Sequence, residues 1–391
     1  MEQTTNGATK HAGKVGFLFR MGHGHATQFD NFRECAPEPL QERSSWIALY
    51  GEGSADLLAN ARWLSPKLRY GRHVLSHAKG GLARQHWQAL FIAADQLNFS
   101  SIARRYPSYF YTDLSPSLKR ELSPWYNHQL KNPTLTRLQT MLYSRMFQSG
   151  CGVFTMSEWA AKGVRRDYHL QPECVHVALP GANLRRWHFV DRSNRSSDRP
   201  IRILMVGGEF ALKGGNLLLD WAERTSLKNW ELDIVTWPSK LPDWVKACLG
   251  NPGMETTVYG SLAPRLPNVR VHCGLRANTL PLMELFEQAD IFCLPTQADG
   301  SSIASLEAMA CGLPVLVGAV GGIPELIQEG VTGMLTRRSD GQDLQVRLEA
   351  LIEDAGLRLS LGRAARAECE RFYNVERQME QIFTVIDREC R

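Results

Sequence analysis

Residues 295–314 read PTQADGSSIASLEAMACGLP, and GGIPE follows at 321–325. The stretch comes directly after the apolar run IFCL at 291–294, which predicts a buried strand. A polar loop of small residues holding Asp299 then leads into an apolar helix that holds Glu307. Free N–H groups at a helix start favour phosphate, and carboxylate oxygens accept hydrogen bonds from sugar hydroxyls. The stretch therefore predicts a nucleotide-sugar pocket.

Outward from this stretch, apolar runs of strand length alternate with helical patterns along the chain. This alternation predicts an α/β fold of two Rossmann-like domains, with parallel sheets facing a central cleft. The polar, proline-ended segment DRSNRSSDRP predicts a linker at 191–200 between domains at 14–190 and 201–373. We expect a disordered lead at 1–13, which lacks the apolar core of a signal peptide. A last helix over 374–391 is compatible with a return to the first domain, although periodicity does not show it. The strands are expected at 15–19, 46–50, 89–94, 109–112, 152–156, 175–178, 201–206, 232–236, 269–272, 291–294 and 315–317.

Charge is unevenly distributed over the 391 residues. Residues 1–190 carry 23 Lys and Arg against 13 Asp and Glu, an excess of 10, whereas the remainder carries 22 against 27, a deficit of 5. The basic half is either solvated surface or a face for an anionic acceptor or a membrane. Nucleic acid is not expected as a partner, because no basic stripe with interleaved aromatic residues occurs. The nine scattered cysteines indicate a reducing, cytoplasmic setting.

A second glycine-rich turn stands at the start of the second domain. The strand at 201–206 is followed by Gly207 and Gly208, then by Lys213 and Gly214. Glycine lets a backbone approach a ligand closely, and the lysine adds a positive charge near a helix start. The alternatives are a tight turn with a surface lysine and a nicotinamide site. The turn lacks the GxGxxG spacing of the latter.

The loop before Glu307 offers the matching anion site. The N–H groups of Ser301, Ser302 and Ile303 are placed to face a diphosphate, with Glu307 about two helical turns beyond Asp299. The alternative is a capping aspartate and a surface glutamate. The residues after Glu307 are mostly apolar, which predicts a buried glutamate that needs a partner. No Asp-x-Asp pair stands near the site, and we expect neither a metal nor a cofactor.

These pieces together resemble the retaining family-four glycosyltransferases. The resemblance rests on VGG…KGG at 206–215, on PTxxDGS leading into LEAMACGLPV at 295–315, and on GGIPELI at 321–327. It implies the GT-B fold, with Lys213 binding the donor diphosphate, Asp299 contacting the transferred sugar and Glu307 contacting the ribose. The family usually has arginine where this chain has Gly208 and glutamate where it has Asp299. The same resemblance extends weakly to 154–161 and 175–183.

In the first domain, the turn RMGHGHATQ at 20–28 resembles a Gly-His-x-Thr signature of a subgroup of these transferases. Gly22 and Gly24 would let the backbone reach a phosphate across the cleft. His25 and Thr27 are candidates for the cleft, and Asp113 and His128 stand in two further short matches. Each of these residues is otherwise solvated or part of the core.

The resulting expectation is a hexosyltransferase that moves a sugar from a nucleotide-sugar donor to a hydroxyl acceptor, with retention. The acceptor is a glycan, a lipid-linked or other anionic molecule, or a small molecule. A peripheral membrane contact through the basic domain fits the charge distribution. The alternative is a catalytically silent GT-B protein that binds a nucleotide sugar or a partner, suggested by Gly208 and Asp299. A GT-B epimerase or phosphorylase is a third possibility.

Overall fold

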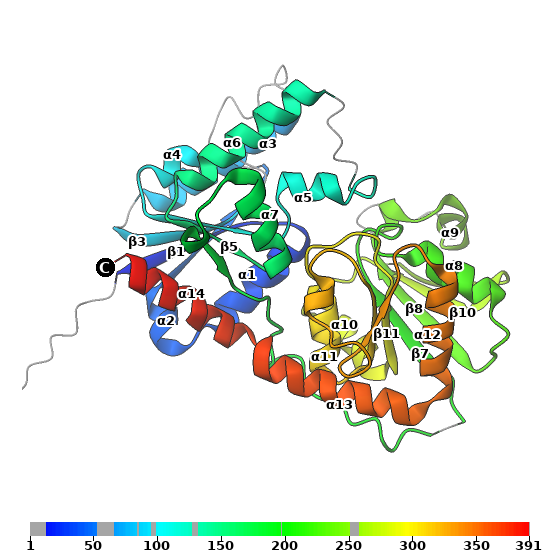
Figure 1. The fold of residues 1–391 in the computed structure, drawn as a ribbon. Coiled ribbons are helices and arrows are strands. Elements are labelled where there is room, and N and C mark those ends of the chain that lie inside the picture. The colour runs from blue at the N-terminus through cyan, green and yellow to red at the C-terminus, as the bar shows by residue number, and fades with distance from the viewer. Residues whose placement is uncertain are drawn as a thin grey trace, which may run out of the picture.

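The apolar runs of the sequence form the strands of two separate sheets, seen in a computed structural model of the chain. The structure describes residues 13–52, 66–83, 86–94, 99–126, 132–196, 198–250 and 258–390. Two α/β domains lie side by side, and the C-terminal helices run along the second and back to the first (Figure 1). This arrangement confirms the predicted class of two Rossmann-like domains.

The first domain is built on a six-stranded sheet in the order β2-β1-β3-β4-β5-β6, and every pairing in it is parallel. Parallel strands require helical crossovers, which cover both faces of the sheet. The elements are β1 (Lys14–Arg20), α1 (His23–Cys35), α2 (Glu38–Arg43), β2 (Ser44–Leu49), α3 (Pro66–Leu82), β3 (Trp87–Ala93), α4 (Ser100–Ala103), β4 (Ser108–Thr112), α5 (Pro116–Glu121), α6 (Pro133–Gln148), β5 (Gly152–Thr155), α7 (Glu158–Tyr168) and β6 (Val175–Val177).

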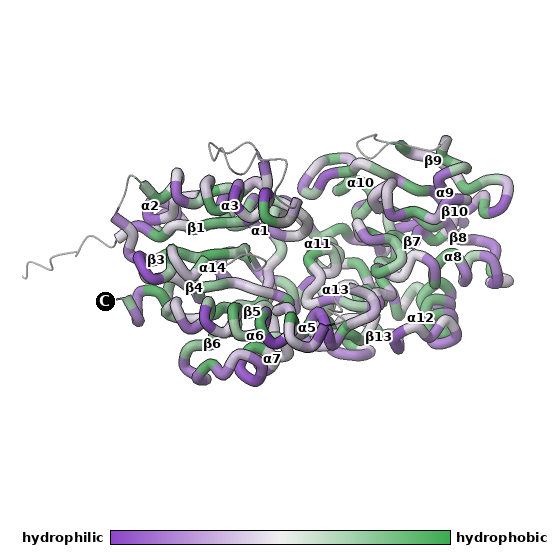
Figure 2. Tube along the Cα trace, turned by 90° about the horizontal axis from the view of Figure 1, so that it is seen from above, coloured by the Kyte–Doolittle hydropathy of each residue, from purple (hydrophilic) through white to green (hydrophobic). Residues whose placement is uncertain are grey.

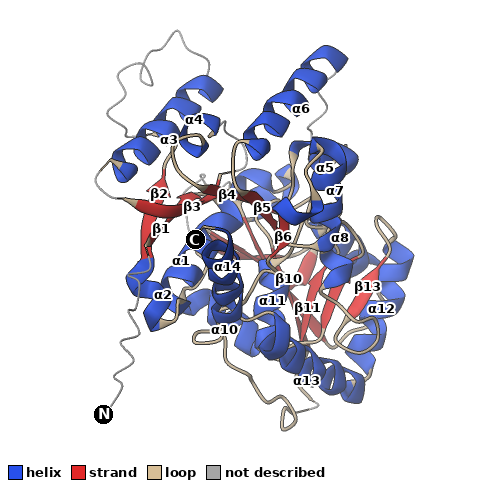
Figure 3. Ribbon diagram, turned by 60° about the vertical axis from the view of Figure 1, so that its left-hand side comes forward, coloured by secondary structure: helices blue, strands red, loops and turns tan. Residues whose placement is uncertain are grey.

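Alternation along β1 gives this sheet two separate cores. Val15, Phe17 and Phe19 pack on the face covered by α1 and α14 (Val375–Glu389), whereas Leu18 packs on the opposite face with α3 and α7. Figures 1 and 3 show α3, α4 and α6 on one side of the sheet and α1, α2 and α14 on the other. Hydrophobic positions concentrate in the strands and the inner helix faces, as Figure 2 shows. Among the described residues, no helix is long and apolar enough to cross a membrane.

The second domain has a seven-stranded sheet in the order β13-β12-β11-β7-β8-β10-β9. Its pairings are parallel, as predicted, except at one edge, where β9 pairs antiparallel with β10. Such an edge strand needs no helical crossover. The elements are β7 (Ile201–Val206), α8 (Gly215–Arg224), β8 (Trp230–Thr236), α9 (Asp243–Cys248), β9 (Val258–Leu262), β10 (Leu266–Cys273), α10 (Leu280–Gln288), β11 (Ile291–Leu294), α11 (Ile303–Ala310), β12 (Val315–Gly318), β13 (Met334–Thr336), α12 (Gly341–Glu353) and α13 (Ala355–Phe372).

The last helix, α14, packs on the first domain. Its apolar face joins the core around β1, where the Phe383 and Phe17 ring centroids lie 5.8 Å apart. Arg43 of α2 donates to Asp387 of α14 at 2.9 Å, and the Ala182 carbonyl accepts from the Val375 N–H at 3.3 Å. The chain therefore passes between the domains twice, once between β6 and β7 and once after α13. The two sheets lie on either side of the first passage, and the exact domain limits stay predictions.

Candidate functional site

Lys213 lies in the turn after β7, and glycine in this turn allows the backbone to pack closely against the end of β11. Gly214 has φ +86°, and a Cβ there would lie 2.2 Å from the Pro295 carbonyl oxygen. A Cβ at Gly207 would lie 2.7 Å from Cγ of Lys213, so this glycine leaves room for the lysine stem. The β7 turn can therefore touch the segment after β11 because Gly214 lacks a side chain.

The two turns are joined by a largely buried ion pair between Lys213 and Asp299. The Lys213 side chain is 20% exposed and that of Asp299 is 6% exposed. Burial raises the pKa of Asp299, the Lys213 ammonium opposes that rise, and the nearby Asp113 carboxylate adds to it. An ammonium has three N–H donors, so the pair leaves donors of Lys213 for a further anion.

The loop between Asp299 and α11 supplies backbone donors beside this pair. Ser302 is the N-cap of α11, and its Oγ accepts a hydrogen bond from the Ser305 N–H at 3.2 Å. Ser301 precedes the cap, and Ile303 is the first residue of the helix. The N–H groups of these residues stand at the positive end of the helix, as the sequence predicted. The Ser302 Oγ also accepts from the Ser305 hydroxyl at 2.7 Å, so its acceptor sites are used within the helix, and its O–H and backbone N–H are the groups left to donate to a ligand.

Glu307 is the unusual carboxylate of the site. It is 3% exposed within α11, and its Oε1 has no hydrogen-bond partner among the described residues. Burial alone raises the pKa of Glu307 to about 8. It forms no hydrogen bond or ion pair with Lys213 or Asp299 in the described part of the chain. The expected protein partner is therefore missing, and a ligand hydroxyl would satisfy this oxygen.

Asp113 follows β4 in the first domain and meets the Asp299 loop directly. A Cβ at Gly300 would lie 2.8 Å from the Asp113 carbonyl oxygen and 2.7 Å from Cγ of Leu114. Tyr126 reaches the same place and donates to the Ala298 carbonyl at 3.3 Å. Burial raises the pKa of Tyr126, and the carboxylates of Asp299, Asp113 and Glu209 raise it further. The carboxyl edges of the two sheets thus meet at Asp299.

The turn after β1 lies on the same interface. Gly22 is the N-cap of α1 with φ +153°, Gly24 is exposed, His25 is 8% exposed and Thr27 is half-buried. One helical turn on, Gln28 donates to the Met156 sulfur at 3.7 Å, and that sulfur accepts from Ser301 Oγ at 3.3 Å. The start of α1 is thereby linked to the Ser301 loop. His128 lies outside the described residues.

Three residues that the sequence did not single out complete the site. A Cβ at Gly208 would lie 2.5 Å from the Trp237 ring, so this tryptophan fills the space that an arginine at 208 would need. Arg20 ends β1, is 9% exposed, and its Nε has no hydrogen-bond partner in the described ranges. Glu325 accepts from the N–H groups of Glu158 and Trp159 at 2.7 and 2.6 Å, and so caps α7 from the other domain. Only the GGIPE motif itself pointed to Glu325.

Metal ligands are not grouped in the part of the chain that the structure describes. There, no set of three or more His, Cys, Asp or Glu residues is placed to hold a metal ion. The expectation that no metal is needed stays a prediction. The charges available to a bound phosphate are those of the Lys213 ammonium and the start of α11.

Comparisons with known proteins agree with this arrangement. Residues 189–368 match the family model described as glycosyl transferases group 1. The D-inositol 3-phosphate glycosyltransferase of Kribbella flavida is 30% identical over 215 residues, which cover 52% of this chain and 49% of that protein. The chain thus spans about half the length of the curated relatives it matches first.

Solved structures extend the likeness to the whole fold. Sucrose-phosphate synthase from Thermosynechococcus elongatus superimposes with a TM-score of 0.71 at 14% identity, covering 96% of this chain and 99% of that one. Anabaena HepE in complex with UDP and glucose gives 0.67 at 17% identity, covering 96% and 100%. These likenesses show the predicted GT-B fold, and the match of residues 189–368 to the group 1 glycosyl transferases supports the predicted resemblance over that part of the chain.

Proposed function

We propose, from the match of residues 189–368 to the group 1 glycosyl transferases, that this chain is a retaining hexosyltransferase that uses a nucleotide-sugar donor. The observation that carries the proposal is the buried Lys213–Asp299 pair beside the start of α11. A lysine and helix-start N–H groups are a binding site for phosphate, and a buried carboxylate beside them suits a sugar hydroxyl.

Each part of the donor has a counterpart in the site. The diphosphate is bound by the Lys213 ammonium and by the N–H groups of Ser301, Ser302 and Ile303. The transferred sugar donates a hydroxyl to Asp299. The ribose donates a hydroxyl to Oε1 of Glu307, the buried oxygen without a described partner. HepE, whose structure holds UDP and glucose, makes uridine nucleotides the first candidates.

Catalysis then depends on stabilising the leaving diphosphate. As the anomeric carbon–oxygen bond breaks, negative charge grows on the diphosphate, and Lys213 with the positive end of α11 stabilises it. The acceptor hydroxyl attacks from the side of the leaving group, and a diphosphate oxygen takes its proton. The interface between the domains holds donor and acceptor in a fixed relative orientation, and this orientation lowers the activation barrier further. This mechanism requires no metal ion.

The acceptor side is assigned to the first domain. The edge of this domain that faces Asp299 is formed by His25, Thr27 and Asp113 and by the backbone at Gly22 and Gly24. We place the protein at the cytoplasmic face of a membrane, where a lipid-linked or anionic acceptor would meet the basic domain. Helix α6 supports this, because it exposes an apolar face beside the basic residues Arg137 and Arg145. That face consists of Leu135, Leu138, Met141 and Leu142, which are 41–51% exposed.

The donor proposal is tested by calorimetry with UDP-, GDP- and ADP-glucose, with chelator and then with Mg²⁺. We expect saturable binding of one nucleotide sugar, equal under both conditions. Binding should weaken by about a hundredfold in Lys213→Ala, an effect of about 3 kcal/mol. Lys246→Ala, which removes an equal charge from α9, serves as the control. Normal affinity in a folded Lys213→Ala variant would remove Lys213 from the site.

A measurement of turnover distinguishes an enzyme from a catalytically silent binding protein. Slow release of free nucleotide from the bound donor, with water as acceptor, is the expected activity before the acceptor is known. Tight donor binding without nucleotide release, also with anionic lipid and glycan acceptors, would favour the silent alternative. Flotation with vesicles of anionic lipid, compared for wild type and Leu138→Glu, tests the α6 contact.

A further inference from the structure

A second cavity in the described residues lies away from the interdomain site. A cavity of about 540 Å³ opens beneath the second sheet. Its walls are the linker, the residues just before β7, β8, β11 and β12, and the junction of α12 and α13. It therefore lies at the amino edge of the sheet, whereas Lys213 and Asp299 follow strands at the carboxyl edge.

The cavity is strongly cationic. Six cations line it against three carboxylates, a difference of three positive charges. Two of the cations come from α13, one precedes β8, and the others belong to the linker. The cations are Arg192, Arg195, Arg199, Lys228, Arg358 and Arg363, and the carboxylates are Asp191, Asp290 and Glu353.

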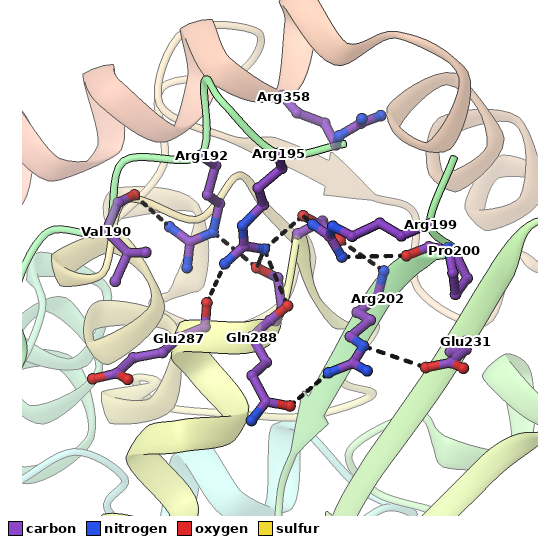
Figure 4. Close-up of polar contacts among 12 residues, drawn as sticks. Val190, Arg192, Arg195, Arg199, Pro200, Arg202, Glu231, Glu287, Gln288 and Arg358 are labelled. Atoms are coloured by element: carbon purple, nitrogen blue, oxygen red, sulfur yellow. Dashed lines mark hydrogen bonds and ion pairs between the residues drawn. The ribbon is translucent and has the colours of Figure 1, made fainter. Parts of the chain in front are cut away.

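Two of these arginines are committed to the fold. Arg192 donates to the carbonyls of Phe286, Ala289, Val190 and Cys311 at 2.7–2.9 Å. Arg195 donates to the Gln288 and Ala289 carbonyls and to Asp290. Both hold the linker to the carboxyl end of α10, where backbone carbonyls lack helical partners (Figure 4). These two side chains need no ligand to explain them.

The remaining cations use only some of their N–H donors within the protein, so the other donors are available to a ligand. Arg199 pairs with Asp290, the carboxylate that Arg195 already uses. Arg358 donates from one nitrogen to the Leu351 and Ile352 carbonyls at 2.7 and 2.8 Å. In Figure 4, Arg358 lies above the linker arginines with no polar contact to the residues drawn there. Lys228 and Arg363 are exposed and form no hydrogen bond or ion pair with the described residues.

The electrostatics of the cavity favour an added anion. Burial and the charge of Arg195 lower the pKa of Arg192 to about 10. Burial also lowers the pKa of Arg358, which Arg199 lowers further and Asp290 opposes. Like charges in a partly desolvated space repel, and a phosphate group would relieve that repulsion while accepting several charge-assisted hydrogen bonds.

Apolar residues also line the cavity. They include Ile201, Leu227, Pro314 and Ile352, and Phe189, which is 42% exposed, lines it too. An inorganic anion would leave this surface in water, whereas a ligand with an apolar ring would cover it. The volume suits a small ligand.

We propose that this cavity is a second ligand site, which binds a small organic phosphate that carries a planar apolar group. The phosphate would be held by Arg199 and Arg358, with Arg363 at the rim, and the ring would lie on Ile201 and Ile352. The site is independent of the transfer reaction, since no residue that lines it belongs to the donor site.

The test uses the whole protein with phenyl phosphate as the probe, measured by calorimetry. We expect one probe per chain, and weaker binding of inorganic phosphate, which lacks the ring. Arg358→Gln and Arg199→Gln should each weaken phenyl phosphate about tenfold. Arg363→Gln, which removes no described contact, should weaken it severalfold in a fully folded protein.

Two controls separate the sites. Arg104→Gln removes an exposed arginine of the first domain, and Lys213→Ala alters the donor site; neither should change phenyl phosphate binding. No binding by the wild type, or binding lost in Lys213→Ala and kept in Arg363→Gln, would overturn the proposal. Binding to phosphatidic acid vesicles without binding of phenyl phosphate would assign the cavity to a lipid headgroup and overturn the soluble ligand.

Discussion

The two edges of the second sheet use charge in opposite ways. At the carboxyl edge, one lysine pairs with one buried carboxylate, and a second carboxylate, Glu307, keeps an oxygen without a described partner. At the amino edge, Arg192 alone donates four hydrogen bonds to backbone carbonyls. Satisfied polar groups stabilise a fold, whereas unsatisfied buried groups are retained where a ligand completes them. The contrast separates the edge that binds the donor from an edge where Arg192 fixes the linker to the end of α10.

The largest effect that the comparison predicts is on transfer, at the carboxyl edge. Lys213→Ala removes the charge that faces the leaving diphosphate, and donor turnover should fall by about 10²–10³-fold. Asp299 is then buried without its cation, and because its pKa is already raised it can take up a proton. We therefore expect the variant to fold. Initial rates of nucleotide release and circular dichroism measure the two effects, and a rate within threefold of wild type would contradict the assignment.

The corresponding change at the amino edge should affect stability. Arg192→Met removes the side-chain donor of the Phe286 carbonyl and one of the two donors of the Ala289 and Cys311 carbonyls, and the free energy of unfolding should fall by about 3 kcal/mol. Urea denaturation measures this, with Arg337→Met, whose side chain is 73% exposed, as control. Donor affinity of the folded fraction should stay unchanged. A loss of donor affinity with normal stability would reverse the roles of the two edges.

The sequence predicted the carboxyl edge much better than the amino edge or the domain interface. Lys213, Asp299 and the start of α11 stand in local motifs, and eleven expected strands correspond to elements of the two sheets. The two strands that were not expected are β13, which has three residues, and β9, an antiparallel edge strand with a glycine inside it. Tyr126, Trp237 and Glu325 act through partners far away in the chain, which spacing cannot reveal. The sequence assigned the linker arginines no structural role, because the helix end whose carbonyls they bind is distant in sequence.

The buried carboxyl group of Glu307, whose Oε1 has no described partner, can be tested through the pH dependence of protein stability. Its pKa of about 8 in the folded protein lies above the ordinary 4.5, so the folded protein binds more protons than the unfolded chain between these values. Its contribution to stability is therefore fully present below pH 4.5 and is lost as pH rises through 8, by at most about 1.4 kcal/mol per pH unit. Urea denaturation between pH 5 and 8 should show this slope in the wild type and a smaller one in Glu307→Gln. Glu380→Gln, an exposed change on α14, should keep the wild-type slope, and so would Glu307→Gln if its carboxyl titrated normally.

The smallest effect concerns how the carboxyl edge is assembled from two domains, whereas the amino edge belongs to one. Glu325 accepts from two N–H groups of α7 across the interface, and its carboxylate lies at the positive end of that helix. Glu325→Gln removes the charge and one of the two acceptors, so the Glu158 and Trp159 amides should exchange hydrogen about tenfold faster, an effect of ~1 kcal/mol for an exposed contact. Glu329→Gln is the matched control, because Glu329 accepts from the Leu335 N–H at 2.6 Å within its own domain. It should speed exchange only at Leu335. If hydrogen exchange of the α7 amides were the same in Glu325→Gln as in the wild type, the Glu325 contact would not hold the domains together. The packing of Gly300 against Asp113 would then be the contact that positions the two domains at the carboxyl edge.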